Sequence, residues 1–147
     1  MYYLDFLFMC GGFYMVFNIA LCDMKDKMIP DMLTSAVWIA GAYFALFNPF
    51  VAFVIVATFA LLFSLNSAFV SIKQLPMFSW GDVLLIPPVA GIVAVGGVFW
   101  VIVLGVCVLA GLVRSFAARK EEALGLYVCV AYTLCFAVQV FSSRISP

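Results

Sequence analysis

Long uncharged stretches separated by short charged intervals run through this chain, and their lengths predict its helices. A helix needs about 20 apolar residues to cross a hydrocarbon core of about 30 Å. Residues 6–22, which follow two tyrosines, form one such span. Residues 32–72 would be roughly 60 Å long as a single straight helix at about 1.5 Å per residue. They therefore predict two spans, with a break at Asn48 and Pro49.

The next uncharged stretch, residues 83–113, is long for one helix and short for two, and the charge distribution decides between them. If it forms a hairpin that turns at Gly96 and Gly97, six of the seven basic residues fall on one side of the membrane. A single helix would divide them almost evenly, which is unfavourable because basic residues concentrate in cytoplasmic loops. We therefore predict the hairpin, with short fourth and fifth helices and a sixth helix over residues 123–141.

The chain is thus predicted to be an all-α membrane bundle of about six transmembrane helices, forming a single domain over residues 1–147. Both termini are expected outside, with three cytoplasmic loops centred on residues 23–31, 73–81 and 114–122. The basic residues on the cytoplasmic side are Lys25, Lys27, Lys73, Arg114, Arg119 and Lys120. Arg144 is the one basic residue on the other side.

Composition strengthens the membrane assignment and disfavours several classes of function. Of 147 residues, 68% are hydrophobic and 10% are charged, and the mean hydropathy is +1.26, far above that of soluble domains. The net charge is zero and the basic residues form no dense cluster, so a nucleic-acid surface is not expected. The sequence has no histidine and no C-x-x-C pair, so we expect neither a metal nor a cofactor.

Two further features are interpreted as structural. The first apolar stretch has Asp5 ahead of it instead of a basic residue, and no small-residue cleavage site follows it. It is therefore interpreted as a retained helix and not as a signal peptide. The five cysteines lie in or beside apolar stretches and are interpreted as small buried hydrophobic side chains. They are Cys10, Cys22, Cys107, Cys129 and Cys135.

Two acids that border apolar sequence are the candidates for chemistry. Asp23 directly follows one apolar stretch, and Asp82 directly precedes another. A charge buried at such a boundary costs up to about 3 kcal/mol on insertion scales, so intramembrane acids are functional candidates by default. Two carboxylates that lie close together can activate a water molecule against a peptide carbonyl, because one stays protonated while the other is ionised.

The acids near these helix ends also have structural interpretations. Asp26 stands between two lysines and is interpreted as a solvated loop charge. Asp31 follows Pro30 and is predicted to be the N-cap of the second helix. Asp82 could equally be only a cap for the fourth helix, since Gly-Asp dipeptides commonly mark turns.

Two motifs around these acids resemble those of the prepilin peptidases, the membrane aspartyl proteases that remove the leader from type IV pilin precursors. The first motif consists of Asp23, five further residues and then Ile29-Pro30-Asp31-x-Leu33-Thr34. The second is Ser79-Trp80-Gly81-Asp82-Val83, which is similar to the family's Gly-x-Gly-Asp-Val. Both occur in the family's order and on the same predicted side of the membrane.

The resemblance implies an aspartic endopeptidase of the bacterial inner membrane that cleaves prepilin or pseudopilin precursors at the cytoplasmic face, for a type IV pilus or for protein secretion. It implies Asp23 and Asp82 as the catalytic pair. The supporting motif residues that it implies are Ile29, Pro30, Asp31, Thr34, Ser79 and Gly81. Its partners would be the precursors and membrane lipid. Without the family's cytoplasmic domain for amino-terminal methylation, a short, cleavage-only form is expected.

Two positions depart from the family pattern and keep other functions open. Ser79 stands where a glycine is usual, and Leu84 stands where a lysine commonly follows. If the backbone at residue 79 required a positive φ, serine there would cost about 1 kcal/mol or more. One alternative is a catalytically silent relative that binds prepilins or pilus-assembly proteins. Another is a small ion or proton transporter, which is disfavoured because no acid lies mid-helix.

Overall fold

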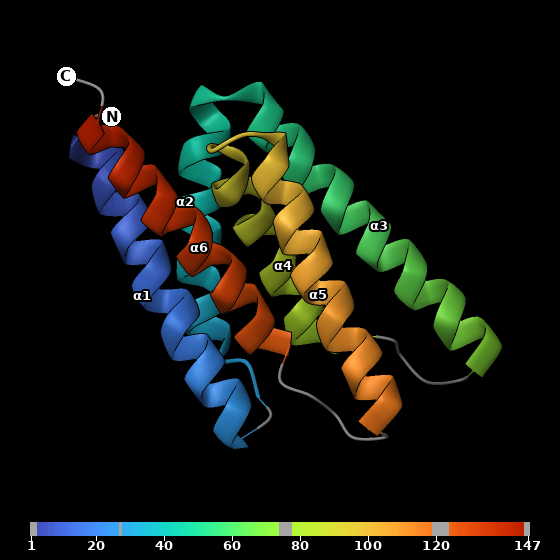
Figure 1. The fold of residues 1–147 in the computed structure, drawn as a ribbon. Coiled ribbons are helices and arrows are strands. Elements are labelled where there is room, and N and C mark those ends of the chain that lie inside the picture. The colour runs from blue at the N-terminus through green and yellow to red at the C-terminus, as the bar shows by residue number, and fades with distance from the viewer. Residues whose placement is uncertain (1–2, 27, 74–77, 119–123, 146–147) are drawn as a thin grey trace.

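The computed structural model describes residues 3–26, 28–73, 78–118 and 124–145, and these residues form six helices and no strand. The all-α fold that the sequence predicts is therefore confirmed. Successive helices run in opposite directions, and the start of α1 and the end of α6 lie at the same end of the bundle (Figure 1). The helices are α1 (Tyr3–Asp26), α2 (Asp31–Phe47), α3 (Pro49–Lys73), α4 (Trp80–Ala94), α5 (Val98–Ala118) and α6 (Leu124–Ile145).

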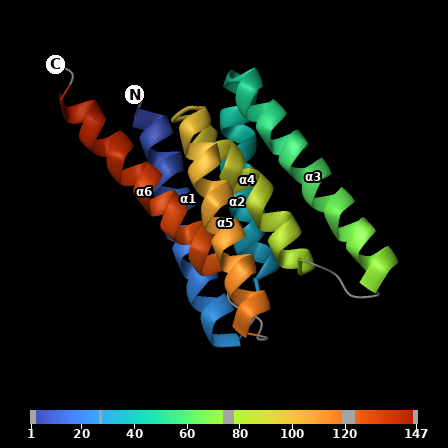
Figure 2. The same ribbon diagram turned by 45° about the vertical axis from the view of Figure 1, so that its right-hand side comes forward.

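The helices differ in whether they are long enough to cross a membrane. α1, α3, α5 and α6 are long and apolar enough to do so, whereas α2 and α4 are apolar but have only 17 and 15 residues. At about 1.5 Å per residue these two helices are roughly 25 and 22 Å long. Their amino-terminal ends stop short of the carboxyl-terminal ends of α1 and α5, as Figures 1 and 2 show. The residues that begin α2 and α4 are therefore set back from the end of the bundle.

The two helix breaks that the sequence predicts outside the charged loops are confirmed. Asn48 separates α2 from α3, and its side-chain oxygen accepts a hydrogen bond from the Phe50 amide at 3.0 Å. Pro49 begins α3, a position where its missing N–H leaves no hydrogen bond unmade. α4 and α5 form the predicted hairpin, in which Gly97 has a φ of +103°, a conformation that glycine adopts without strain.

One predicted helix length is wrong. The fifth helix is not short, because α5 has 21 residues and continues past Arg114 to Ala118. The sixth span agrees with the candidate membrane span Leu124–Phe141, but its helix continues beyond the span to Ile145. Both extensions have the same physical reason. A charged residue marks the edge of the hydrocarbon, but arginine is a good helix former and a helix can continue into the polar interface.

α4 is the central helix of the bundle. It packs against α2, α3, α5 and α6, and all but its first two residues and Leu84 are buried. α1 packs between α2 and α6, which brings the first and last helices side by side (Figure 1). The five cysteines are free, with Cys129 and Cys135 buried and the others half-buried, which fits their interpretation as hydrophobic side chains.

Candidate functional site

One end of the bundle holds the ends of α1, α3 and α5 and the beginnings of α2, α4 and α6, opposite the beginning of α1 and the end of α6 (Figure 1). We call this end the loop end. It contains the last turn of α1 and the first turns of α2, α4 and α6. Among the basic residues predicted here, Lys27, Arg119 and Lys120 lie outside the described residues, whereas Lys25 lies in the last turn of α1.

Asp23 lies in the last turn of α1 with only 7% of its surface exposed. It continues the buried face of that helix, which includes Val16, Ile19 and Ala20 at helical spacing. Its Oδ2 accepts a hydrogen bond from the backbone N–H of Gly125 at 2.9 Å. Gly125 lies in the first turn of α6, where backbone N–H groups have no partner within their own helix and carry positive partial charge. The carboxylate of Asp23 supplies that partner.

Asp82 is likewise buried, with 7% of its surface exposed, and it closes a capping box at the start of α4. The Ser79 hydroxyl donates to Asp82 Oδ2 at 2.7 Å, and the Ser79 N–H donates to the same oxygen at 3.2 Å. In return, Ser79 Oγ accepts from the Asp82 N–H at 3.1 Å. Ser79, and not Asp82, is the N-cap residue of α4.

The backbone at Ser79 does not need glycine. Its φ is −64° and its ψ is 156°, an extended conformation open to any residue. Because φ at residue 79 is not positive, serine there carries no strain cost. The serine instead contributes the hydroxyl that contacts Asp82, which a glycine could not do.

The two motifs contact each other through Ile29 and Gly81. A Cβ atom built on Gly81 would lie only 2.9 Å from the Cβ atom of Ile29, so residue 81 has no room for a side chain. Ile29 belongs to the segment between α1 and α2, and Gly81 belongs to the first turn of α4. This contact holds the start of the second motif against the end of the first.

One hydrogen bond lies within the start of α2, and another connects α2 with α4. The buried Thr34 hydroxyl donates to the Pro30 carbonyl at 3.1 Å, and the Trp38 indole N–H donates to the Leu84 carbonyl at 2.8 Å. Leu84 contributes its backbone carbonyl to this bond, so the contact does not depend on which side chain stands there.

Asp23 and Asp82 come from α1 and α4, yet their carboxyl groups are close enough to interact electrostatically. Both are buried, and two charged carboxylates buried near each other repel. In the part of the chain that the structure describes, the hydrogen bonds to each carboxyl group all fall on Oδ2. We call these two residues the aspartate pair.

Asp26 and Asp31 do not join the aspartate pair, and both are exposed. Asp26 is the last residue of α1, and its exposure fits a solvated charge. The prediction that Asp31 is an N-cap is wrong, because the N-cap of α2 is Pro30. The Pro30 carbonyl accepts the first helical bond, from the Thr34 N–H at 3.1 Å, so the helix begins one residue earlier than predicted.

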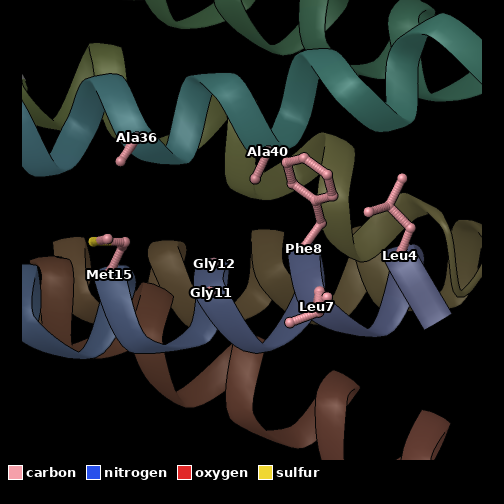
Figure 3. A pocket seen from close by; sticks show the side chains of 8 residues that line it. All are labelled: Leu4, Leu7, Phe8, Gly11, Gly12, Met15, Ala36 and Ala40. Carbon is pink, nitrogen blue, oxygen red and sulfur yellow. The ribbon is translucent and has the colours of Figure 1, made fainter.

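A metal site and an apolar cavity are two other features that a functional site could use. Among the described residues, no group of three or more Cys, Asp or Glu side chains could hold a metal ion. A cavity of about 370 Å³ lies between α1 and α2, lined by apolar residues that include Phe8, Met15 and Ala40 (Figure 3). Neither member of the aspartate pair lines it, so it lies outside the candidate site.

Gly125 is the contact of the aspartate pair that sequence reasoning missed. A glycine three residues after a charged interval, near the start of the last apolar stretch, was its only signal. Comparison of the chain with protein-family models, curated proteins and solved structures gives no match.

Proposed function

We propose that this protein is a membrane aspartic endopeptidase that cleaves the leader peptide of prepilin or pseudopilin precursors. The observation that carries the proposal is the aspartate pair: two buried acids from α1 and α4 that interact at the loop end of a membrane bundle. The resemblance of the surrounding motifs to those of the prepilin peptidases supplies the substrate class. The contact between Ile29 and Gly81, one residue from each motif, supports treating the two motifs as one site.

The proposed chemistry needs one ionised and one protonated carboxyl group. The ionised group takes a proton from water as the water oxygen attacks the peptide carbonyl, and the protonated group donates its proton to the carbonyl oxygen. As the resulting tetrahedral species collapses and its C–N bond breaks, the group that took the water's proton donates it to the leaving amine, and the other carboxylate takes back a proton from a hydroxyl of the tetrahedral carbon. Such a site must admit water, and the pair's position at the end of the helices suits that need. The substrate must present an extended segment, because the carbonyl groups of a helix are already hydrogen-bonded.

The proposal includes a location and an orientation. The protein would lie in the bacterial inner membrane with the loop end facing the cytoplasm. This orientation is supported by the basic residues of the sequence, of which six of the seven fall in or beside the three loops. The partners would be the precursor and membrane lipid, and the mechanism requires no metal or cofactor.

A specific observation favours a second candidate, a catalytically silent relative that binds prepilins or pilus-assembly proteins. Each aspartate already has a structural role, because Asp23 bonds to the start of α6 and Asp82 closes the capping box of α4. Carboxylates that only stabilise helix ends would give a protein that holds its partner without cutting it.

Co-expression with a candidate precursor separates these two functions. In a bacterial host without its own prepilin peptidase, the wild-type protein should convert the precursor to a shorter product on a gel. Mass spectrometry should find a new amino terminus at the leader junction, without an added methyl group. A precursor that stays full-length but co-purifies with the protein would support the silent relative and contradict the peptidase.

A further inference from the structure

The start of α6 contacts the aspartate pair from a part of the chain that belongs to neither motif. The Gly125 N–H donates to Asp23 Oδ2 across 102 positions of sequence, and the bond is buried. Asp23 is at the end of α1, and Gly125 is in the first turn of α6. The orientation of the Asp23 carboxyl group therefore depends on how closely these two helices approach each other.

That approach leaves little space for a side chain at residue 125. A Cβ atom built on Gly125 would lie 3.0 Å from Asp23 Oδ2, 3.3 Å from Asp23 Cβ and 3.5 Å from the Cα atom of Ala20. The first two distances are shorter than ordinary van der Waals contacts, so an added methyl group would press directly on the carboxyl group. Glycine thus provides both the amide donor and the room for the carboxylate to reach it.

We infer that Gly125 is a positioning residue for the proposed cleavage: its amide holds the Asp23 carboxylate in the orientation that lets it act together with Asp82. The inference rests on the proposed function. An N–H at the start of a helix favours a negatively charged acceptor, and a hydrogen bond to a charged group is among the stronger ones in proteins. With Oδ2 held by this bond, the other oxygen of Asp23 keeps a fixed direction relative to Asp82.

Two substitutions separate the role of the N–H from the role of the space. Gly125→Ala keeps the N–H and adds a methyl group beside Asp23, whereas Gly125→Pro also removes the N–H. Proline is tolerated in the first turn of a helix, which makes the second variant reasonable. Gly105→Ala is the matched control, because a Cβ atom at that helical glycine of α5 would contact nothing within 4 Å.

The kinetic test uses purified full-length protein in detergent and a purified precursor that the wild-type protein cleaves. Misplacing a catalytic group by about 1 Å can cost about 100-fold, so we expect Gly125→Ala to lower kcat about 10- to 100-fold. Gly125→Pro should lower kcat further, KM should change less than about threefold, and Gly105→Ala should match wild type. Wild-type kcat in both Gly125 variants, or a change in KM alone, would overturn the inference.

A second measurement reports the contact without any cleavage. In protein labelled with ¹⁵N-glycine, the Gly125 amide resonance is identified by its loss in Gly125→Ala. Asp23→Ala should shift this resonance because it removes the acceptor, whereas Asp26→Asn should leave it in place. An unshifted resonance in Asp23→Ala overturns the inference whatever the kinetics show. If the wild-type protein cleaves no precursor, the proposed function fails and the catalytic role of Gly125 fails with it, even where the contact is present.

Discussion

Both ends of the helix bundle hold buried or half-buried acids, but the surroundings of these acids differ. At the end opposite the loops, Asp5 of α1 is half-buried and accepts a hydrogen bond from the Tyr43 hydroxyl of α2 at 3.0 Å. At the loop end, Asp23 and Asp82 each have a donor as well, yet they are also placed near each other. The hydrogen bond between Tyr43 and Asp5 joins α2 to α1.

Two like charges buried together repel each other. They disfavour each other's ionised form, and burial strengthens the repulsion because the medium screens charges weakly. If the two aspartates only capped helices, the protein would fold as well or better with a neutral side chain in place of one of them. The proposed cleavage at the loop end depends on this difference between the two ends.

The largest predicted difference between the two ends is one of proximity. In a variant with the five native cysteines replaced by alanine, Asp23→Cys with Asp82→Cys should be joined within one molecule by a short bifunctional thiol reagent. Asp5→Cys with Asp82→Cys should not be joined, because those residues lie at opposite ends of the bundle. Mass spectrometry of the linked peptides measures both yields, and equal yields would show that Asp23 lies no nearer to Asp82 than Asp5 does.

Gly81 should be the next most sensitive position. In Gly81→Val the new side chain would displace Ile29 and separate the two motifs, which we expect to cost about 1–3 kcal/mol of stability and to reduce cleavage. Gly11→Ala is the control, because a Cβ atom there would contact nothing within 4 Å. Thermal melting in detergent and precursor cleavage measure the two effects. A Gly81→Val protein as stable and active as the Gly11→Ala protein would show that the motif contact is unimportant.

Ser79 should have a smaller effect that depends on its hydroxyl. Ser79→Ala removes the N-cap oxygen and the donor to Asp82, and we expect a loss of about 1 kcal/mol of stability. Ser79→Gly should cost only a few tenths of a kcal/mol, since glycine is an acceptable N-cap. Melting temperatures in the same detergent compare them. Because the backbone at residue 79 is extended, a gain of stability in Ser79→Gly would contradict the described conformation.

Asp26→Asn should have the smallest effect. Asp26 is exposed at the end of α1. Surface substitutions of this kind usually change stability by less than about 0.5 kcal/mol. Cleavage of the precursor should stay within about twofold of wild type, and a loss comparable to that of an aspartate-pair variant would place Asp26 in the site.

The sequence predicts the features of this molecule that depend on local pattern. Asp23 and Asp82 stand at the borders of apolar stretches, and Asn48 and Pro49 interrupt one, so their places at helix ends follow from hydropathy and turn chemistry. The hairpin between α4 and α5 follows from the positions of the basic residues. The interpretation of Asp26 as a solvated charge also agrees with its exposure.

What the sequence could not predict depends on helix ends and on distant contacts. The exact start of α2 was missed because the Pro30 carbonyl already accepts a helical bond, one residue before Asp31. The length of α5 was missed because hydropathy marks the edge of the membrane and not the end of a helix. The bond from Gly125 to Asp23 joins residues 102 positions apart, and only the packing of α6 on α1 reveals it.

If Asp23 and Asp82 together perform the proposed cleavage, neutral variants of the acids at the two ends of the bundle should differ in activity. Purified wild type, Asp23→Asn, Asp82→Asn and Asp5→Asn are incubated with purified precursor in one detergent, and the leader and product are quantified. Asparagine can still accept a hydrogen bond at each position but cannot exchange a proton as a carboxyl group does. We predict that Asp23→Asn and Asp82→Asn each lose at least about 100-fold in rate, while Asp5→Asn stays within about twofold. Near-normal cleavage by folded Asp23→Asn or Asp82→Asn would show that the two aspartates do not perform the cleavage together.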